Sequence, residues 1–369
     1  MPHNSAAVLT GPFEKLTVRD AAYTAPGAGE IVIRNRAIAV NPLDSIKQST
    51  GDMMYRWLPY PAVLGEDVAG EVVEVGSDVP RFQPGDRVVA YAVGLEKKRN
   101  HAAEGGFQLY TVVRSSLASP LPSSIAFADA VVLPLGISTA ASALFQQDQL
   151  DLQHPGLPST GEAVVVWGGS TSVGSNAIQL AVAAGYLVVT TASPHNHERM
   201  RALGATYVFD YASATVVADV ATALAGRTVA GVFAVGTGSA EPAVAIAAAT
   251  GAKRVALASP SVALDSVPQR KGLNLGLAKV GLQLVAGNVA LQARCARHGI
   301  RARFVWGSTL MDNEVGPMLW EGFLPAALAE GRYLLAPTAE IVGSGLESVQ
   351  PALDTLREGV SARKLVVTL

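Results

Sequence analysis

Residues 161–196 read GEAVVVWGGSTSVGSNAIQLAVAAGYLVVTTASPHN. An apolar, β-branched run breaks into glycines and hydroxyl residues, continues as an alanine-rich helical segment, and returns to a second apolar run. This order predicts a strand, a turn, a helix and a second, parallel strand. In such a unit the N-terminus of the helix follows the end of the first strand, where its free N–H groups can bind an anion.

Three glycines, Gly168, Gly169 and Gly174, surround the break between the first apolar run and the helix. Glycine permits a tight turn and close packing of the helix on the strand, which leaves the helix N-terminus open to a pyrophosphate. The motif reads G-x-T-x-x-G, because Thr171 stands where a dinucleotide-binding fingerprint has its middle glycine. A plain strand-to-helix turn is the alternative, but the strands on both sides favour dinucleotide binding.

The residue after the second apolar run is expected to select the cofactor. A carboxylate there would accept hydrogen bonds from both ribose hydroxyls of NAD(H) and would repel the 2′-phosphate of NADP(H). Ser193 occupies this place, and Asn196 and Arg199 nearby offer groups that suit a phosphate, so we expect NADP(H). His195 has two open interpretations, a phosphate contact or an exposed residue at a helix start. For His197 the second is preferred.

Length and composition exclude several classes of protein. The 369 residues suffice for two domains, and a net charge of -2 gives no reason to expect nucleic acid or an anionic membrane as partner. The single cysteine, Cys295, excludes an intramolecular disulfide framework and a multi-cysteine zinc site. The charge-free run 163–196 is long enough to span a bilayer, but Gly, Ser, Thr and Asn interrupt it, and the N-terminus has no signal-peptide pattern. A cytoplasmic protein is therefore expected.

The pattern of expected strands and helices changes near residue 127. The first third is rich in strands and turns, whereas helical segments and short apolar runs alternate after it, which predicts a doubly wound α/β sheet. We expect a β-rich domain formed by residues 1–126 and 308–369, and a doubly wound domain formed by residues 127–307. The expected strands are 30–40, 68–79 and 86–93 in the first domain, and 163–167, 186–192, 207–211, 231–235 and 254–259 in the second.

Together with the turn, five further segments resemble the medium-chain dehydrogenase/reductase superfamily over essentially the whole chain. The resemblance implies a GroES-like catalytic domain, which is the β-rich one, and a Rossmann domain that binds the cofactor. The segments are AVNPLDSIK (39–47), VLGEDVAGEVVEVGSDV (63–79), FQPGDRV (82–88), EGGFQLYTVV (104–113) and LPLGISTA (133–140).

The resemblance is to the zinc-independent branch, which includes quinone oxidoreductases and enoyl reductases. In the zinc alcohol dehydrogenases of the superfamily a cysteine and a histidine ligate the catalytic zinc, whereas the corresponding residues here are Asn41 and Glu66. The four-cysteine lobe is also missing, so no metal is expected. Within that branch, GGST (168–171), ASPHN (192–196) and VFDY (208–211) are similar to fungal trans-acting enoyl reductases that serve polyketide synthases.

This narrower resemblance also implies the site residues. A lysine of the NPLDSIK segment, Lys47, would face the substrate, and Thr139 would act near the nicotinamide; a solvated surface lysine is the alternative for Lys47. The residues implied for the cofactor are Gly169, Ser170, Thr171, Ser172 and Val173 at the pyrophosphate, Ser193, His195, Asn196 and Tyr211 at the adenosine phosphate, and Ile137, Val235, Leu257 and Val305 near the nicotinamide.

Without a metal there is no Lewis acid to polarise a carbonyl, so reduction of a conjugated C=C bond is more plausible than reduction of C=O. We expect NADPH-dependent reduction of an enoyl thioester or enone, either small or carrier-bound, with a polyketide synthase as a partner. The alternatives are an NADPH:quinone oxidoreductase and a non-catalytic NADPH-binding protein. Asp44 and Asp67 are interpreted as structural, and residues 272–287 as a core or interface helix or, alternatively, the wall of an acyl-chain pocket.

Overall fold

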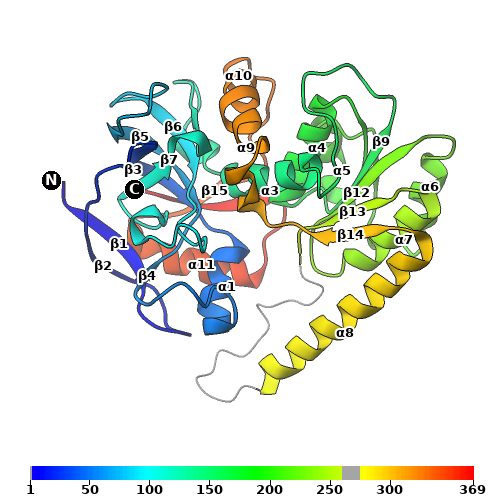
Figure 1. The fold of residues 1–369 in the computed structure, drawn as a ribbon, viewed down its shortest axis with the longest axis horizontal. Helices are drawn as coiled ribbons and strands as arrows, with labels where there is room; N and C mark the ends of the chain where they lie inside the picture. Colours follow the sequence, from blue (N-terminus) through cyan, green and yellow to red (C-terminus); the bar gives the residue numbers. More distant parts are fainter. Residues whose placement is uncertain (1, 260–274) are drawn as a thin grey trace. The chain divides into compact units, whose positions relative to one another are not determined.

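The computed structural model describes residues 2–259 and 275–369, which form two compact units (Figure 1). Unit 1 comprises the described residues 2–135, 275–277 and 316–369, and unit 2 comprises 136–259 and 278–315. Unit 2 therefore begins after residue 135 and ends at residue 315, with the start of the 275–298 helix grouped with unit 1, whereas the domain limits predicted from the sequence are after 126 and 307.

Unit 1 is built on a mostly antiparallel sheet of order β15-β16-β3-β5-β6-β8, with β7 also paired to β3, and on a smaller sheet of order β2-β1-β4. Its long strand β3 has two apolar runs on either side of residues 34–36, and Ile31, Ile33 and Ile38 are fully buried. The strands are β1 (Asn4–Leu9), β2 (Thr17–Ala21), β3 (Glu30–Ala39), β4 (Ala62–Val63), β5 (Asp67–Val75), β6 (Arg87–Tyr91), β7 (Tyr110–Arg114), β8 (Ala118–Pro120), β15 (Thr338–Ser344) and β16 (Arg363–Thr368).

The C-terminal strand β16 lies beside β3 in antiparallel register, with Val366 opposite Ala39. Residues 363–368 are therefore part of the sheet of unit 1. The α-helices of this part of the chain are α1 (Pro42–Thr50), α2 (Phe127–Ala130), α9 (Val315–Pro317), α10 (Leu324–Ala329) and α11 (Val349–Glu358).

Unit 2 has a parallel sheet of order β11-β10-β9-β12-β13-β14, the doubly wound arrangement expected from the sequence. Its first strand β9 is fully apolar, and Val164, Val165 and Val166 are fully buried because helices cover both faces of the sheet. The elements are β9 (Ala163–Trp167), β10 (Leu187–Thr191), β11 (Tyr207–Phe209), β12 (Val229–Ala234), β13 (Arg254–Leu257), β14 (Arg301–Phe304), α3 (Pro134–Phe145), α4 (Ser172–Ala183), α5 (His197–Ala202), α6 (Val216–Ala223), α7 (Ala240–Thr250) and α8 (Leu275–His298).

The helical segment Phe127–Phe145 is long and apolar enough to cross a bilayer, but 83% of the tested window is buried inside the protein, as in a core helix. The charge-free run 163–196 forms β9, α4 and β10. Of the apolar segment 272–287, residues 272–274 lie outside the described residues. The remainder is helical, as expected, but Leu282 and Val285 are exposed, so the core interpretation is wrong for this part of α8.

Candidate functional site

The turn between β9 and α4 has the close packing that its glycines predict. Gly168 has φ +83°, and a Cβ on Gly174 would lie 2.2 Å from the Gly168 carbonyl oxygen. Thr171 caps the helix, because its hydroxyl accepts the Gly174 N–H at 2.9 Å and donates to the Gly168 carbonyl at 2.8 Å. Threonine at the middle position of the fingerprint therefore stabilises the turn through its side chain.

The same turn is fixed to the neighbouring strand β10. The N–H groups of Gly168 and Gly169 donate to the hydroxyl and the carbonyl of Thr191 at 3.1 and 2.9 Å. A Cβ on Gly169 would lie 2.2 Å from the Thr190 hydroxyl oxygen, so glycine is required there as well. The first turn of α4, Ser172 and Val173, then presents backbone N–H groups at the carboxyl ends of β9 and β10.

The residues expected at the adenosine phosphate follow β10. Ser193 is half-buried, His195 is exposed, and the Asn196 amide lies 3.2 Å from a ring nitrogen of His195. Tyr211, beyond β11, is 51% exposed. His197 is half-buried with a ring nitrogen 3.0 Å from the Ala192 carbonyl oxygen, so it supports the turn and is not an idle exposed residue.

The residues expected near the nicotinamide lie at the carboxyl edge of the same sheet. Val235 follows β12, Leu257 ends β13, and Val305 follows β14 and donates its N–H to the Leu257 carbonyl at 2.8 Å. All three are buried, as are Ile137 and Thr139 on α3. Unit 2 thus gathers polar groups at one part of its carboxyl edge and apolar groups at another, as a dinucleotide requires.

In unit 1, Lys47 lies on α1 and is not a solvated surface lysine, because its side chain is 0% exposed. Its Nζ donates to Asp52 Oδ1 at 2.8 Å and to the Tyr55 carbonyl at 3.0 Å, and it lies 4.5 Å from the centre of the Tyr60 ring. The ammonium group therefore holds the segment 52–60 against α1. An ammonium has three N–H donors, and these two hydrogen bonds use two of them.

A buried polar cluster surrounds the N-terminus of α1. The Asn41 amide donates to Asp67 Oδ2 at 2.8 Å, and the Asn41 N–H donates to Asp44 Oδ2 at 2.7 Å. The Lys364 ammonium, from β16, donates to Asn41 Oδ1 and lies 2.8 Å from Asp67 Oδ2. The second oxygen of Asp67 accepts the Leu135 N–H at 2.6 Å. Asp44 and Asp67 have the structural roles expected of them.

This cluster does not suit the zinc ion of the metal-dependent relatives. Zinc is bound by thiolates, imidazoles and carboxylates, but Asn41 stands at one ligand position and the Lys364 ammonium already supplies the positive charge beside Asp67. Across residues 2–259 and 275–369, no group of three or more His, Cys, Asp or Glu side chains could hold a metal ion.

Two buried carboxyl groups, those of Glu66 and Asp44, have pKa values above their usual range. Burial raises the pKa of Glu66 well above its usual range, and the nearby Asp44 raises it further. The Tyr91 hydroxyl donates a hydrogen bond to Glu66 Oε1 at 3.3 Å. Burial also raises the pKa of Asp44 to about 7, against the opposing effect of the Asn41 N–H. Glu66 is therefore a buried carboxylic acid near neutral pH.

Replacing Glu66 with glutamine should stabilise the protein more at pH 8 than at pH 5. The unfolded Glu66 ionises above pH 4 to 5 whereas the folded one stays protonated, so the wild type loses stability as the pH rises and the glutamine variant does not. The difference should grow by up to about 1.4 kcal/mol per pH unit while the folded carboxyl remains protonated. Denaturant titrations of both proteins at pH 5, 6, 7 and 8 measure it. A difference independent of pH would mean that Glu66 is ionised when folded.

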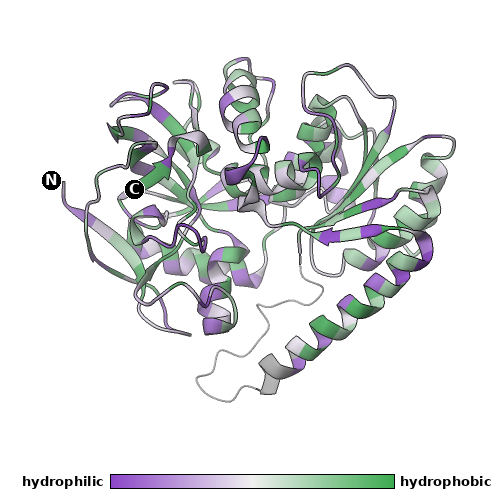
Figure 2. Cartoon of the chain, viewed as in Figure 1, coloured by the Kyte–Doolittle hydropathy of each residue, from purple (hydrophilic) through white to green (hydrophobic). Residues whose placement is uncertain are grey.

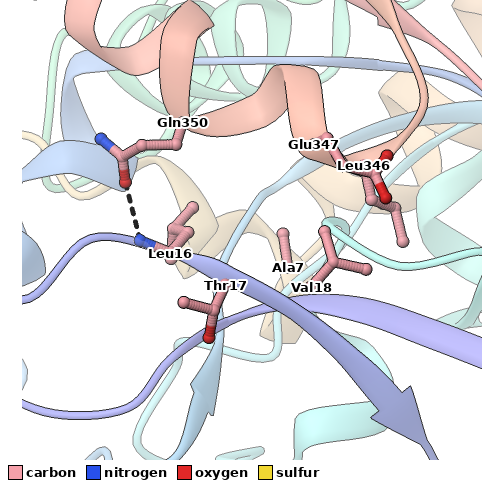
Figure 3. A pocket seen from close by; sticks show the side chains of 7 residues that line it. All are labelled: Ala7, Leu16, Thr17, Val18, Leu346, Glu347 and Gln350. Carbon is pink, nitrogen blue, oxygen red and sulfur yellow. Dashed lines mark hydrogen bonds between the residues drawn. The ribbon is translucent and has the colours of Figure 1, made fainter.

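A separate pocket of about 280 Å³ lies in unit 1, between β2 and the start of α11 (Figure 3). The Gln350 side chain reaches across it and accepts the Leu16 N–H at 2.7 Å. None of the residues expected at the active site lines this pocket. Its lining residues are Ala7, Leu16, Thr17, Val18, Leu346, Glu347 and Gln350.

Sequence reasoning missed Lys364, because nothing local marks a role for it. The residue belongs to the run RKLVVT, which reads as an ordinary strand, and its partner Asn41 is 323 residues away in the chain. One signal was available. A lysine at an inward position of an otherwise apolar strand must find a buried acceptor or anion, because an unpaired buried charge is costly.

Comparison with known proteins gives consistent matches. The family model of the alcohol dehydrogenase GroES-like domain matches residues 27–123. The chain is 47% identical to dehydrogenase pigH of Monascus ruber over the full length of both, and 39% identical to trans-enoyl reductase himH of Aspergillus japonicus, covering 92% of this chain and 90% of that one. Among solved structures, the CurK enoyl reductase has a TM-score of 0.72 at 17% identity, covering 100% of this chain and 99% of that one. A quinone oxidoreductase of Pseudomonas syringae has a TM-score of 0.67 at 24% sequence identity, and the match covers 100% of both chains.

Proposed function

Because the chain belongs to the medium-chain dehydrogenase/reductase superfamily, a family of nicotinamide-dependent oxidoreductases, we propose that it reduces an activated C=C bond with NADPH and without a metal. The substrate class is an enoyl thioester or an enone. Unit 1 is the GroES-like catalytic domain in this proposal, and unit 2 is the Rossmann domain. The trans-enoyl reductases among the relatives support the reaction type.

The observation that carries the proposal is the state of the two lysines in unit 1. The Lys364 ammonium contacts both Asn41 and Asp67, where it supplies the positive charge. The ligands that would bind a zinc ion for carbonyl reduction are therefore lacking in this proposal. Lys47 is buried, and its Nζ donates two hydrogen bonds within unit 1, to Asp52 and to the Tyr55 carbonyl, which leaves one of its three N–H groups for a substrate. An enone or enoyl thioester needs one such donor at its carbonyl oxygen, and hydride addition at the β-carbon then has no need for a Lewis acid.

For the cofactor, the first turn of α4 would bind the pyrophosphate, and Ser193, His195, Asn196 and Tyr211 would bind the adenosine phosphate. Ile137, Val235, Leu257 and Val305 would pack on the nicotinamide, with Thr139 beside its reacting side. When bound, NADPH supplies the hydride. The chain's own residues hold the alkene, exclude water, and donate a hydrogen bond from Lys47 Nζ to the carbonyl oxygen, where charge develops as the C=C bond breaks. The α-carbon then takes a proton from a side chain or from water.

Steady-state assays with a panel of enoyl thioesters, enones and quinones, each with NADPH, test the proposal. We expect turnover of the enoyl thioester to yield the saturated product with one NADPH consumed per alkene. Turnover restricted to quinones would identify a quinone oxidoreductase instead. Tight binding of NADPH with no turnover of any acceptor would indicate a binding protein of the same fold.

A further inference from the structure

Helix α8 has two apolar faces, of which unit 2 covers only one. Leu291 and Cys295 are 7% and 1% exposed and join the core formed with α6, α7 and the sheet. On the opposite side, Leu282, Val285 and Val289 are 71%, 63% and 63% exposed. At 100° per residue these three side chains lie within a sector of about 60°, whose centre is about 130° from the buried face. Alternating apolar and polar residues along the length of α8 are visible in Figure 2.

The uncovered face is a continuous stripe. It extends along the helix through the exposed alanines Ala286, Ala293 and Ala296. Leu282, Val289 and Ala296 are spaced by seven residues, the repeat that places side chains on one seam of a helix packed against another helix. This spacing fits a helical partner better than an extended peptide.

The Lys, Arg, Asp and Glu residues within α8, residues 275–298, are all basic. Lys279, Arg294 and Arg297 are exposed, and within the described residues none of them pairs with a carboxylate. The neighbouring arginines outside the helix differ, because Arg254 pairs with Asp151 at 2.9 Å and Arg303 with Asp148 at 3.1 Å. Between Asp265 and Asp312 the sequence has seven lysines and arginines and no acidic residue, in a chain whose net charge is -2.

The charges decide which partner fits. A second copy of the chain would bring the same unpaired cations against each other, which is unfavourable. A membrane-surface helix normally carries large aromatic or leucine side chains on its apolar face, whereas this stripe consists of one leucine, two valines and three alanines. A helix with an acidic border and a small apolar face matches both the size and the charge of the stripe.

We propose that α8 docks an acidic helix of the protein domain that delivers the enoyl group as a thioester, that is, a carrier domain. This inference rests on the proposed function, because only a reductase of thioesters has a use for such a domain. A small stripe with a charged border suits a transient complex, in which electrostatic attraction speeds association and the product-loaded domain leaves again. The carrier-bound substrate of the reaction would thus be selected partly outside the active site.

Two substrates with the same enoyl chain test the proposal, one on a recombinant fungal polyketide-synthase carrier domain and one on N-acetylcysteamine. The double variant Arg294→Glu/Arg297→Glu should lower kcat/KM for the carrier-bound substrate at least 10-fold and change it less than 2-fold for the small thioester. Leu282→Ser/Val289→Ser should act in the same direction. The matched control is Arg19→Glu/Arg227→Glu, which makes the same charge change at exposed positions outside α8 and should leave both substrates unaffected.

Binding of the carrier domain to the NADPH-loaded protein, followed by fluorescence anisotropy, is the second measurement. It should weaken with added salt and be lost in the Arg294→Glu/Arg297→Glu variant. Equal binding by wild type and variant, absence of binding by the wild type, or an equal loss on both substrates would overturn the docking role of α8. Failure of the wild type to reduce either thioester would instead overturn the proposed function, and the anisotropy result would still decide the docking.

Discussion

Replacing Lys47 with methionine is expected to lower kcat for an enoyl thioester about 10²- to 10³-fold, the usual cost of removing one oxyanion donor. Methionine has a similar length and fills the buried space, so the loss reports the missing ammonium and not a cavity. NADPH affinity should be nearly unchanged, because the residues expected to bind the cofactor lie in unit 2. Stopped-flow or steady-state measurement of kcat, together with a fluorescence titration of NADPH, checks both parts.

Asp52→Asn is the matched control for Lys47. The Asp52 side chain accepts from the Lys47 ammonium at 2.8 Å but is 63% exposed, so asparagine preserves the contact without the charge. If Lys47 donates to the substrate, Asp52→Asn should retain most of kcat. If Lys47 serves only to hold the segment 52–60, the two variants should lose similar activity. Wild-type turnover by Lys47→Met would disprove the donor role and leave the carbonyl oxygen to backbone N–H groups or water.

Replacing Ser193 with aspartate should weaken NADPH binding by roughly 1–3 kcal/mol, which is about 5- to 150-fold in Kd. Ser193 is half-buried just beyond β10, so a carboxylate there would face the 2′-phosphate at close range. NADH lacks that phosphate and offers two hydroxyls to the new carboxylate, so its affinity should be unchanged or improved.

Parallel titrations of wild type, Ser193→Asp and Ser193→Ala with both cofactors measure this preference. The alanine variant removes the hydroxyl without adding charge and should lose much less NADPH affinity than the aspartate variant. If the wild type bound NADH as tightly as NADPH, the expected preference for NADPH would be wrong.

The parts of the fold that could be predicted from sequence are those with local determinants. The strands β9 and β10 and the helix α4 follow from apolar runs and helical spacing, and the turn follows from Gly168 and Gly174, whose φ angle and close contact admit no side chain. Thr171 looked like a departure from the fingerprint. Its side chain in fact caps α4, which a local rule for helix N-termini could have shown.

The parts that could not be predicted depend on which distant segments pack together. For Lys47, a substrate-facing lysine and a solvated surface lysine were equally good interpretations. The local sequence could not decide between them, because Lys47 is buried by its contacts with Asp52 and the segment 52–60. The apolar segment 272–287 suggested a core or interface helix. Hydropathy indicates that apolar side chains favour burial, but it does not show which faces of a helix the rest of the fold covers. Lys364 carried no local signal at all.

The pairing of β16 with β3 has a consequence for how the protein is made. Asn41 leaves the ribosome 323 residues before its partner Lys364. The ion pair of Lys364 with Asp67 can form only after β16 has been made and has paired with β3. An aspartate buried before that pairing would lack its cation, which is costly, so we expect unit 1 to bury the cluster around Asn41 late in folding. The order of synthesis thereby sets the order in which this half of the protein can be completed.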